Sequence, residues 1–403
     1  MNKRFILIVL DSFGIGEMDD VLSYHPLDKG ANTALNIIKN NPSISLPTLE
    51  SLGLVNCIGE PFKNHLTSDY ANFGTSKLQH EGADSFLGHQ EIMGSLYRKP
   101  HIAPFSESID IVETKLQQSG YQTRRITRNG LSLIVVNECA TVGDNLETDG
   151  GRVYNVTGSL DLISFDELKK IGYVVRECVT VARVITFGGC NVSLENIINA
   201  IRIIDNTYIG VDAPMSGVYN LGYQVIHMGY GVDPKTQIQS ILQNHNIPVF
   251  LLGKFADVII LEDTPTYTGV DSAMLLDKLI ELIKNNDNGL FCLNIQETDL
   301  AGHAQSVSRY SEVLELVDKR IKDVIDIMND NDFLVITADH GNDPTIGHSN
   351  HTRERVPLLI KYKDFKNIKI GLRNTMSDTA ATISEFFSVE RPENGTSYLS
   401  SFK

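Results

Sequence analysis

Three aspartates and three histidines in this 403-residue sequence have the side-chain types and the placement of metal ligands. They are Asp11, Asp299, His303, Asp339, His340 and His351. Carboxylate oxygens and imidazole nitrogens together suit Zn²⁺ or Mn²⁺. Three of each type divide into two metal ions with three protein ligands each, which leaves open positions for a substrate. Paired metal ions stabilise both the attacking and the leaving oxygen in phosphoryl transfer, so this is the chemistry that the six residues indicate.

Each of these residues alone has a simpler interpretation, because an Asp after a strand is often a helix cap and a single His is usually structural. The adjacent pair Asp339-His340, followed by Gly341-Asn342-Asp343, argues against that interpretation for the set. His348 offers a further imidazole three residues before His351. We expect His351 to be the ligand and His348 to lie behind the ligands.

A hydroxyl residue between two glycines, Ser85, lies in the segment Glu81–Glu91. It could be a nucleophile at a helix N-terminus, where backbone N–H groups hold a phosphate. A metal ion would lower the pKa of the hydroxyl and remove the need for a histidine base. The alternative is that Ser85 only caps the helix. His89 and Glu91 in the same segment are either structural or orient the phosphate.

Short apolar segments bounded by turns precede or follow most of these residues. They are Phe5–Leu10, Pro248–Leu252, Leu290–Ile295, Phe333–Thr337 and Val356–Ile360. Such segments are typical of strands buried on both faces. Apolar residues at helical spacing predict helices over 308–328 and 377–387, the second capped within Ser377-Asp378-Thr379. This alternation indicates an α/β domain with a largely parallel sheet, in which ligands bind beyond the carboxyl ends of the strands.

The middle of the chain has a different pattern. Short alternating stretches and two helical ones occur there, at Leu131–Val136, Arg152–Val156, Val181–Phe187, Ile109–Gln118 and Phe165–Cys178. We therefore expect an α+β domain at 98–222, inserted into a discontinuous core formed by 1–97 and 223–403. The total length agrees with two or three domains at about 150 residues per domain.

Composition limits the partners of this protein. There are 35 Lys and Arg against 50 Asp and Glu, a net charge of −15, which argues against nucleic-acid and membrane partners. It does not argue against a phosphorylated small molecule, because bound metal ions invert the local charge. No apolar segment approaches the roughly 20 residues of a membrane helix. Five scattered cysteines without a CxxC pair predict free thiols, and we expect a cytoplasmic protein.

Four segments of the sequence resemble the phosphopentomutase family: Val9–Gly16, Gly88–Gly94, Ile336–Pro344 and His351–Leu359. The resemblance covers roughly 1–97 and 223–403 and is weaker between them. This family belongs to the alkaline-phosphatase-like metalloenzymes, as does cofactor-independent phosphoglycerate mutase. The resemblance implies an alkaline-phosphatase-like α/β core, with a mostly parallel central sheet flanked by helices, and an inserted α+β cap domain.

By motif position, the resemblance also implies two divalent metal ions, usually Mn²⁺, with Zn²⁺ or Mg²⁺ as alternatives. One ion would be held by Asp11, Asp339 and His340, and the other by Asp299, His303 and His351. Ser85 stands where the family has a phosphorylated threonine, and Lys254 matches a family lysine near the substrate phosphate. The implied reaction moves phosphate between C1 and C5 of ribose or deoxyribose, in nucleotide and pentose phosphate metabolism.

The sequence departs from the family in three places. The nucleophile is Ser85 instead of threonine, which is chemically competent. Asp299 and His303 are four residues apart, as in the phosphoglycerate mutases and one closer than in phosphopentomutases. In the insert, the residues that bind sugar and phosphate in the family are replaced here by Val156–Gly158, Phe187 and Asn220–Tyr223. Because arginine usually fixes a phosphate through paired hydrogen bonds, we predict a retained reaction centre with an altered substrate pocket.

Three functions are compatible with these residues. The first is a two-metal phosphomutase that acts on a phosphorylated sugar through phospho-Ser85. The second is a metal-dependent phosphatase or phosphodiesterase, which requires that water reaches the same phosphoenzyme. The third is a non-catalytic metal-binding protein, against which the presence of all six ligands counts.

Overall fold

The computed structural model describes residues 3–148 and 150–403. The chain divides into two compact units, one made of the residues up to Tyr97 together with Asp233–Lys403, and the other of Arg98–Val232. The smaller unit ends at Val232, ten residues beyond the boundary at 222 that the sequence predicted. The reason is that β10 (Gln224–Gly229) pairs with β7 (Arg183–Gly189) in the sheet of the smaller unit.

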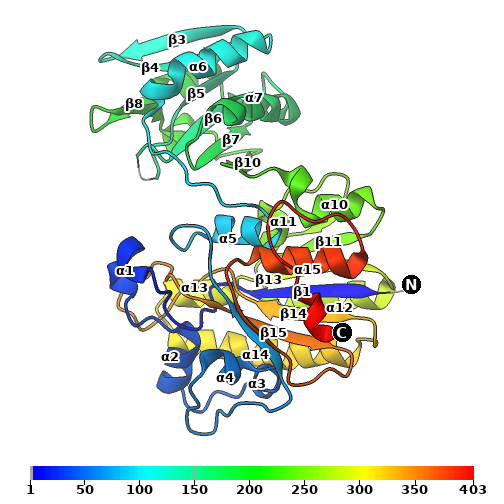
Figure 1. The fold of residues 1–403 in the computed structure, drawn as a ribbon. Coiled ribbons are helices and arrows are strands. Elements are labelled where there is room, and N and C mark those ends of the chain that lie inside the picture. The colour runs from blue at the N-terminus through cyan, green and yellow to red at the C-terminus, as the bar shows by residue number, and fades with distance from the viewer. Residues whose placement is uncertain (1–2, 149) are drawn as a thin grey trace. The chain divides into compact units, whose positions relative to one another are not determined.

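The larger unit is built on an eight-stranded sheet with the order β12-β11-β13-β1-β14-β15-β2-β16 (Figure 1). Its strands are β1 (Arg4–Leu10), β2 (Asn72–Ser76), β11 (Val249–Leu252), β12 (Thr266–Tyr267), β13 (Gly289–Ile295), β14 (Phe333–Thr337), β15 (Val356–Tyr362) and β16 (Lys369–Arg373). Neighbouring strands are parallel except in the pairs β14–β15 and β15–β2. The five apolar segments predicted as strands are confirmed, and so is the α/β class with a mostly parallel sheet.

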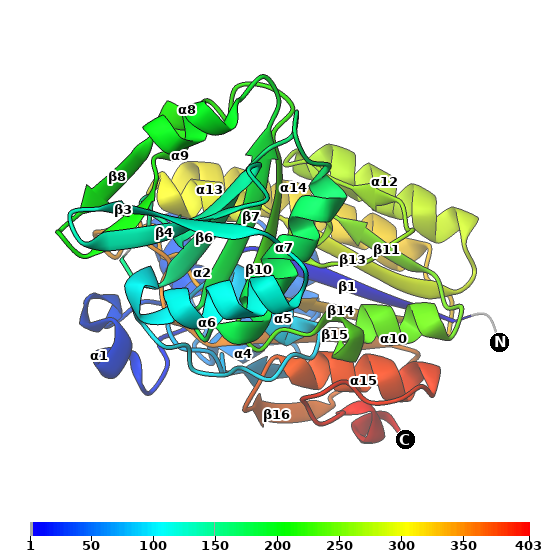
Figure 2. The same ribbon diagram turned by 90° about the horizontal axis from the view of Figure 1, so that it is seen from above.

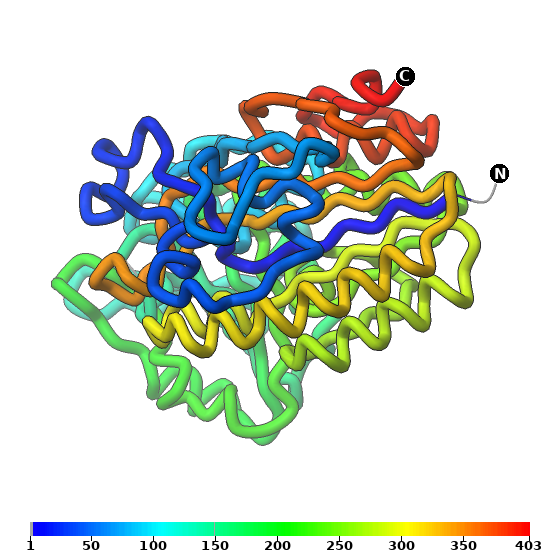
Figure 3. Tube along the Cα trace, turned by 90° about the horizontal axis from the view of Figure 1, so that it is seen from below, coloured from blue at the N-terminus to red at the C-terminus, as the bar shows by residue number. Residues whose placement is uncertain are grey.

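Helices cover both faces of this sheet. Figures 1 and 3 show α12 (Ser272–Asn285) and α14 (Val307–Asp326) together with α2 (Thr33–Asn40) and α3 (Pro47–Ser51) on one face. The other face carries α5 (Ser85–Ile92), α10 (Ile238–Asn244) and α15 (Ser377–Phe387). The cap predicted for α15 is wrong, because the helix follows Met376 and no side chain caps it.

The central strand β1 explains how the sheet positions polar residues. All seven of its residues are buried, as a parallel strand with a neighbour on each side requires. Leu7 lies opposite Cys292 of β13 on one side and Val335 of β14 on the other. These three strands run in the same direction and end at the same edge. Residues that follow β1, β13 and β14 in sequence therefore gather at that edge.

The smaller unit has a six-stranded sheet with the order β10-β7-β6-β5-β4-β3, of which only the β6–β7 pair is parallel. The remaining strands are β3 (Thr123–Arg128), β4 (Leu131–Val136), β5 (Ala140–Asp144) and β6 (Val153–Ser159). The helices α6 (Phe105–Gln118) and α7 (Phe165–Cys178) lie side by side on this sheet (Figure 2). The α+β character predicted for this part of the chain is confirmed.

Strand β4 shows how the small unit is held together. Ile134 and Val136 belong to the apolar cluster beneath α6 and α7, whereas Leu133 and Val135 belong to a second cluster. That second cluster includes the hairpin β8 (Ile201–Ile204) and β9 (Tyr208–Val211), together with α8 (Leu194–Asn199) and α9 (Ala213–Ser216). Alternate side chains of a strand point to opposite faces, so this sheet is buried on both sides.

Within the described chain, none of the helices combines the length and the apolar character needed to cross a bilayer. The five cysteines are free thiols, as the sequence predicted.

A buried carboxyl joins two layers of the small unit and gives a stability prediction. Asp144 accepts hydrogen bonds from the backbone N–H groups of Phe105 and Ile209, both at 2.9 Å. Burial raises the pKa of Asp144 to about 6. Because the folded state then binds the proton more tightly than the unfolded state, this contribution to stability falls as pH rises from about 4 to about 6.

We expect Asp144→Asn to lower the free energy of unfolding by about 1–3 kcal/mol at pH 7, because an amide can accept only one of the two bonds with its oxygen. The loss in Tm relative to wild type should be larger at pH 4.5 than at pH 7. Asp212→Asn is the control, because Asp212 caps α9 and asparagine caps a helix equally well. A loss in Tm that does not change with pH would contradict the assignment.

Candidate metal centre and nucleophile

The residues predicted to do the chemistry all lie in the larger unit, where the parallel strands end. Asp11 directly follows β1, and the pair Asp339-His340 follows β14 after a single alanine. Asp299 and His303 belong to α13 (Glu297–His303), the helix after β13. His351 lies in the loop that leads into β15. The structure therefore brings together all six side chains.

The first group of predicted ligands is fully buried. The donor atoms of Asp11, Asp339 and His340 lie within 4.8 Å of one another, and all three residues have no exposed surface. His340 Nε2 is 3.2 Å from Asp339 Oδ2 and 3.6 Å from Asp11 Oδ1. Nevertheless, neither His340 Nε2 nor Asp11 Oδ1 forms a hydrogen bond with any described residue. Unpaired polar atoms in a protein interior are costly, and a bound cation would satisfy both.

The second group lies beside the first. His303 Nε2 is 3.3 Å from Asp299 Oδ2, and His351 Nε2 is 3.3 Å from Asp299 Oδ1. The two Nε2 atoms are only 3.1 Å apart. The rings of His340 and His351 stack with their centroids 3.9 Å apart, so the two groups are adjacent. Separation by four residues places Asp299 and His303 on one face of α13.

Backbone carbonyls orient the three imidazoles. His340 Nδ1 contacts the carbonyl oxygen of Gly341 at 2.9 Å, and His303 Nδ1 contacts that of Ser349 at 2.6 Å. His351 Nδ1 contacts the carbonyl oxygen of Ala83 at 2.8 Å. A carbonyl accepts, so each ring carries a proton on Nδ1, which leaves Nε2 as the nitrogen that can bind a metal ion. This is the usual arrangement of metal-binding histidines, and the residues present therefore fit divalent metal ions.

Ser85 is the first residue of α5, and its hydroxyl is not used to cap the helix. The cap is Asp84, whose carboxylate accepts a hydrogen bond from Leu87 N at 2.8 Å. Ser85 Oγ instead donates to Asp339 Oδ2 at 2.6 Å and accepts from Lys254 Nζ at 3.0 Å. The hydroxyl therefore lies at a helix N-terminus, against a ligand of the first group and beside an ammonium group.

Lys254 is the cation nearest to the carboxylates. Its Nζ is 2.5 Å from Asp11 Oδ2 and 4.0 Å from Asp299 Oδ2. Burial lowers the pKa of the Lys254 ammonium, but Asp11 and Asp339 outweigh burial and raise that pKa above its ordinary value. The lysine begins α11 (Lys254–Val258), directly after Gly253. Gly253 has φ of 63°, and a Cβ there would meet Asn294 O at 2.5 Å, so this approach requires glycine.

The buried carboxylates and the imidazole of His340 shift one another's pKa values. Burial raises the pKa of Asp11, and the neighbouring carboxylate of Asp339 adds to the effect. Burial also acts to lower the pKa of His340, but the carboxylates of Asp339, Asp11 and Asp299 outweigh it and raise that pKa to about 9. Protons and Lys254 therefore compensate the carboxylates when no metal ion is bound. Metal binding must displace the His340 proton.

Several supporting residues were not predicted from the sequence. Asn294, at the end of β13, donates from Nδ2 to Asp11 Oδ2 at 2.9 Å, and its Oδ1 lies 3.0 Å from His89 Nε2. Asn342 donates from Nδ2 to Asp299 Oδ1 at 3.0 Å. The only sequence signal for Asn294 is a polar residue within an apolar strand, and the signal for Asn342 is its place beside Asp339-His340.

His89 and Glu91 have different roles. His89 Nδ1 lies 2.9 Å from Ser85 O and 3.3 Å from Asp339 Oδ2, so this ring helps to place Ser85. Glu91 accepts hydrogen bonds from backbone N–H groups, including Gln79 N at 3.0 Å, and is structural. Arg353 supports the same region, because its Nη1 donates to the carbonyl oxygens of His80 and Gly82 just before Ser85.

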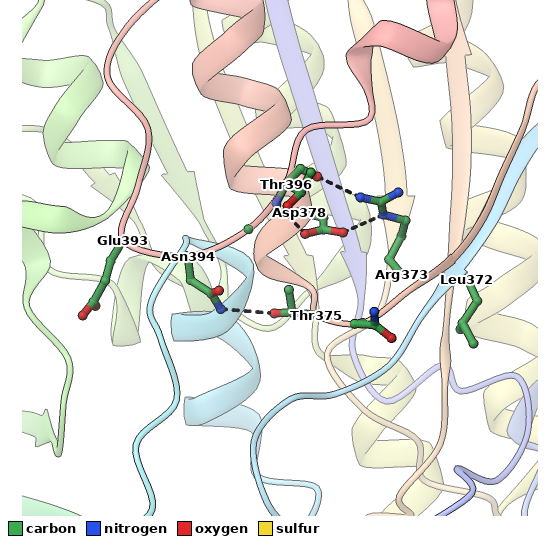
Figure 4. Close-up of a pocket in the computed structure, with 9 residues that line it drawn as sticks. Leu372, Arg373, Thr375, Asp378, Glu393, Asn394 and Thr396 are labelled. Atoms are coloured by element: carbon green, nitrogen blue, oxygen red, sulfur yellow. Dashed lines mark hydrogen bonds and ion pairs between the residues drawn. The ribbon is translucent and has the colours of Figure 1, made fainter.

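A cavity of about 420 Å³ lies elsewhere in the larger unit and contains none of these residues (Figure 4). Its lining comprises Leu372, Arg373, Asn374, Thr375, Asp378, Glu393, Asn394, Gly395 and Thr396. The guanidinium of Arg373 donates to Asp378 Oδ2 at 2.6 Å and to Thr396 O at 3.0 Å. That cation is therefore already paired with a carboxylate of the same cavity.

The chain is similar to several known proteins. The sequence model of the Metalloenzyme superfamily matches residues 3–391. The phosphopentomutases of Alkaliphilus oremlandii and Acetivibrio thermocellus are each 31% identical to this chain, over 100% and 99% of it and 99% of each relative. A solved structure of phosphoglycerate mutase from Leishmania mexicana aligns with a TM-score of 0.47 and 14% identity, over 98% of this chain and 96% of that one.

This protein is an enzyme that depends on divalent metal ions, as its match to the Metalloenzyme superfamily shows. Within that superfamily the chain belongs to the phosphopentomutase family, and it is a metal-dependent phosphomutase. The resemblance seen in the sequence is confirmed.

Asn294 gives a test of the centre that leaves every proposed ligand in place. We expect Asn294→Ala to weaken divalent metal binding by about 10–100-fold, because groups that orient ligands commonly contribute that much. Titration of metal-free protein with Mn²⁺ measures the effect. Asn286→Ala is the control, since Asn286 only donates to Leu282 O after α12. Equal affinities in the two variants would contradict a role for Asn294 in orienting Asp11.

Proposed function

We propose that this phosphomutase transfers phosphate within a phosphorylated sugar through a phosphoserine at Ser85. The observation that carries the proposal is the position of Ser85 Oγ, at the N-terminus of α5, 2.6 Å from Asp339 Oδ2 and 3.0 Å from Lys254 Nζ. Five of the six predicted ligands form two adjacent donor groups that share His340, and His303 Nε2 lies 3.1 Å from His351 Nε2. The Ser85 hydroxyl, the Lys254 ammonium and the two groups of metal donors therefore lie close together.

Two divalent ions, Mn²⁺ by family resemblance, would supply Lewis-acid stabilisation of the phosphoryl oxygens when bound. Asp11, Asp339 and His340 would hold one, and Asp299, His303 and His351 the other. Ser85 Oγ loses its proton, which Asp339 Oδ2 already accepts in a hydrogen bond, and attacks phosphorus. The new Oγ–P bond forms as the bond from phosphorus to the sugar oxygen breaks, and that oxygen leaves as a hydroxyl with the proton that Ser85 gave up. Backbone N–H groups at the start of α5 and the Lys254 ammonium hold the phosphate.

The second half of the reaction reverses the first on a different hydroxyl. The sugar reorients, its other hydroxyl attacks the phosphorus of phospho-Ser85, and Oγ leaves. Phosphate is conserved throughout, which separates a mutase from a phosphatase. Catalysis of this kind depends on positioning and electrostatic stabilisation more than on covalent chemistry by the protein.

The proposed substrate is a pentose phosphate or a related phosphorylated sugar, because the relatives are named phosphopentomutase. The alternative of a related sugar rests on position 187 of the insert, where the resemblance implies an arginine and this chain has Phe187. Phe187 has only 2% exposed surface, and its ring lies 5.9 Å from that of Tyr219 and 6.1 Å from that of Tyr223. Phe187 therefore packs in the apolar core of the insert, and it offers no charged hydrogen bond to a phosphate.

Ser85 gives the direct test of the phosphoenzyme. We expect Ser85→Ala to lower kcat for ribose 1-phosphate, or for whichever phosphorylated sugar the wild type isomerises, by at least about 10³-fold. Ser85→Thr should retain activity, because threonine supplies the same hydroxyl. Mass spectrometry of substrate-treated protein should find phosphate on residue 85 in wild type and in the threonine variant. Full isomerisation by the alanine variant with intact metal binding would overturn the assignment.

Replacing Lys254 should strengthen metal binding and weaken catalysis. Its ammonium competes with metal ions for Asp11, so we expect Lys254→Met to bind Mn²⁺ at least about 10-fold more tightly without substrate. The same variant should lose about 10²-fold in kcat/KM, because a cation beside the phosphate is removed. Lys278→Met is the control, since Lys278 pairs with Glu281 on α12 and lies over the ring of Tyr267, and it contacts none of the six predicted ligands in the interactions described for it. Weaker metal binding in Lys254→Met would contradict the competition.

A further inference from the structure

A third group of metal-type donors lies in the larger unit and includes none of the six ligands. The donor atoms of His25, Asp28 and His348 lie within 4.8 Å of one another. Both imidazoles approach the same oxygen, with His25 Nδ1 2.5 Å and His348 Nε2 3.1 Å from Asp28 Oδ1. The two rings meet edge to face, with their centroids 5.3 Å apart.

The carboxylate of Asp28 is held in place from its other side. Asp28 Oδ2 accepts a hydrogen bond from Arg353 N at 2.8 Å, which directs Oδ1 toward the two imidazoles. Asp28 is only 1% exposed, so its charge is removed from water. A buried carboxylate requires a compensating cation or hydrogen bonds to each oxygen.

His348 supplies the observation that distinguishes this group from a surface ion pair. Its Nε2 is buried and forms no hydrogen bond within residues 3–148 and 150–403, although Asp28 Oδ1 is 3.1 Å away. The nitrogen is therefore close to a carboxylate without the angle that a hydrogen bond needs. A cation between the two atoms would satisfy both.

The separations suit a small tetrahedral ion. Bonds of 2.0–2.1 Å from Zn²⁺ to N and O place donor atoms about 3.3 Å apart. The His348–Asp28 separation of 3.1 Å already matches, and the His25–Asp28 separation must widen by under about 1 Å. Ligation through His348 Nε2 requires the ring proton to lie on Nδ1. In this structure Nδ1 accepts a hydrogen bond from Asn350 N at 3.3 Å, so that contact must open. That contact is long for a hydrogen bond, so its loss costs little.

We propose that His25, Asp28 and His348 form a zinc site separate from the catalytic centre. Two imidazole nitrogens and one carboxylate oxygen are typical zinc ligands. The fourth position would be taken by water, because the His25 side chain is 37% exposed and leaves the ion open to solvent.

The site would join two segments that support the catalytic centre. His25 precedes the short helical turn Pro26–Asp28, and Asp28 is its last residue. His348 lies three residues before His351. The carbonyl of the next residue, Ser349, accepts from His303 Nδ1. Zinc at this position would therefore restrain the loop that orients His303 and supplies His351.

The test compares zinc binding by the full-length chain in three forms: wild type, the double variant His25→Ala/His348→Ala, and the control His245→Ala. His245 is an exposed histidine paired with Glu390 at 2.5 Å, and it belongs to none of the three donor groups. Metal-free protein is titrated with Zn²⁺ against a chromophoric chelator, and bound zinc is counted by elemental analysis. We expect the double variant to bind one equivalent less than wild type, and the control to bind as wild type does.

The difference of one equivalent does not depend on how many ions the catalytic centre binds, so failure of that centre would be seen separately. Equal zinc stoichiometry and affinity in the double variant and wild type would overturn the proposal. If the double variant does not fold, wild-type crystals give the answer through anomalous scattering at the zinc edge. A peak between the three side chains supports the site, and its absence when zinc fills the catalytic centre overturns it.

Discussion

Three buried carboxylates at one edge of a parallel sheet are the constraint on which the rest of this structure depends. Asp11 and Asp339 have no exposed surface, and Asp299 is 5% exposed. Together they carry three negative charges, against which Lys254 provides one positive charge within 4.0 Å of two of them. Such a cluster is unfavourable without further cations. Two divalent ions would add four positive charges and leave a positively charged site, in a protein whose overall charge is −15.

The sheet makes this concentration of charge possible. Strands β1, β13 and β14 run side by side in one direction. Their buried, mostly apolar residues are followed in sequence by the acidic and imidazole groups. Backbone carbonyls then fix the tautomers of His303, His340 and His351. Helix α5 approaches the same edge and places the Ser85 hydroxyl against Asp339. Fold stability and catalytic geometry therefore share the same contacts.

The sequence predicted the features that local pattern determines. Buried strands appear as short apolar segments, and the residues after them were expected to meet because parallel strands end at a common edge. Features set by contacts between distant segments were not predictable. Asn294 has no local signal for its bond to Asp11, and nothing near His25 indicates that His348 folds beside it. Strand β10 was missed for the same reason, because its place beside β7 decides that it belongs to the smaller unit.

The most direct test of the central claim is anomalous diffraction at the manganese edge from crystals of the Mn²⁺-loaded protein. Two peaks are expected at the edge of the sheet. One should be bounded by Asp11, Asp339 and His340, and the other by Asp299, His303 and His351. A single peak, or manganese bound away from these residues, would contradict a two-metal centre.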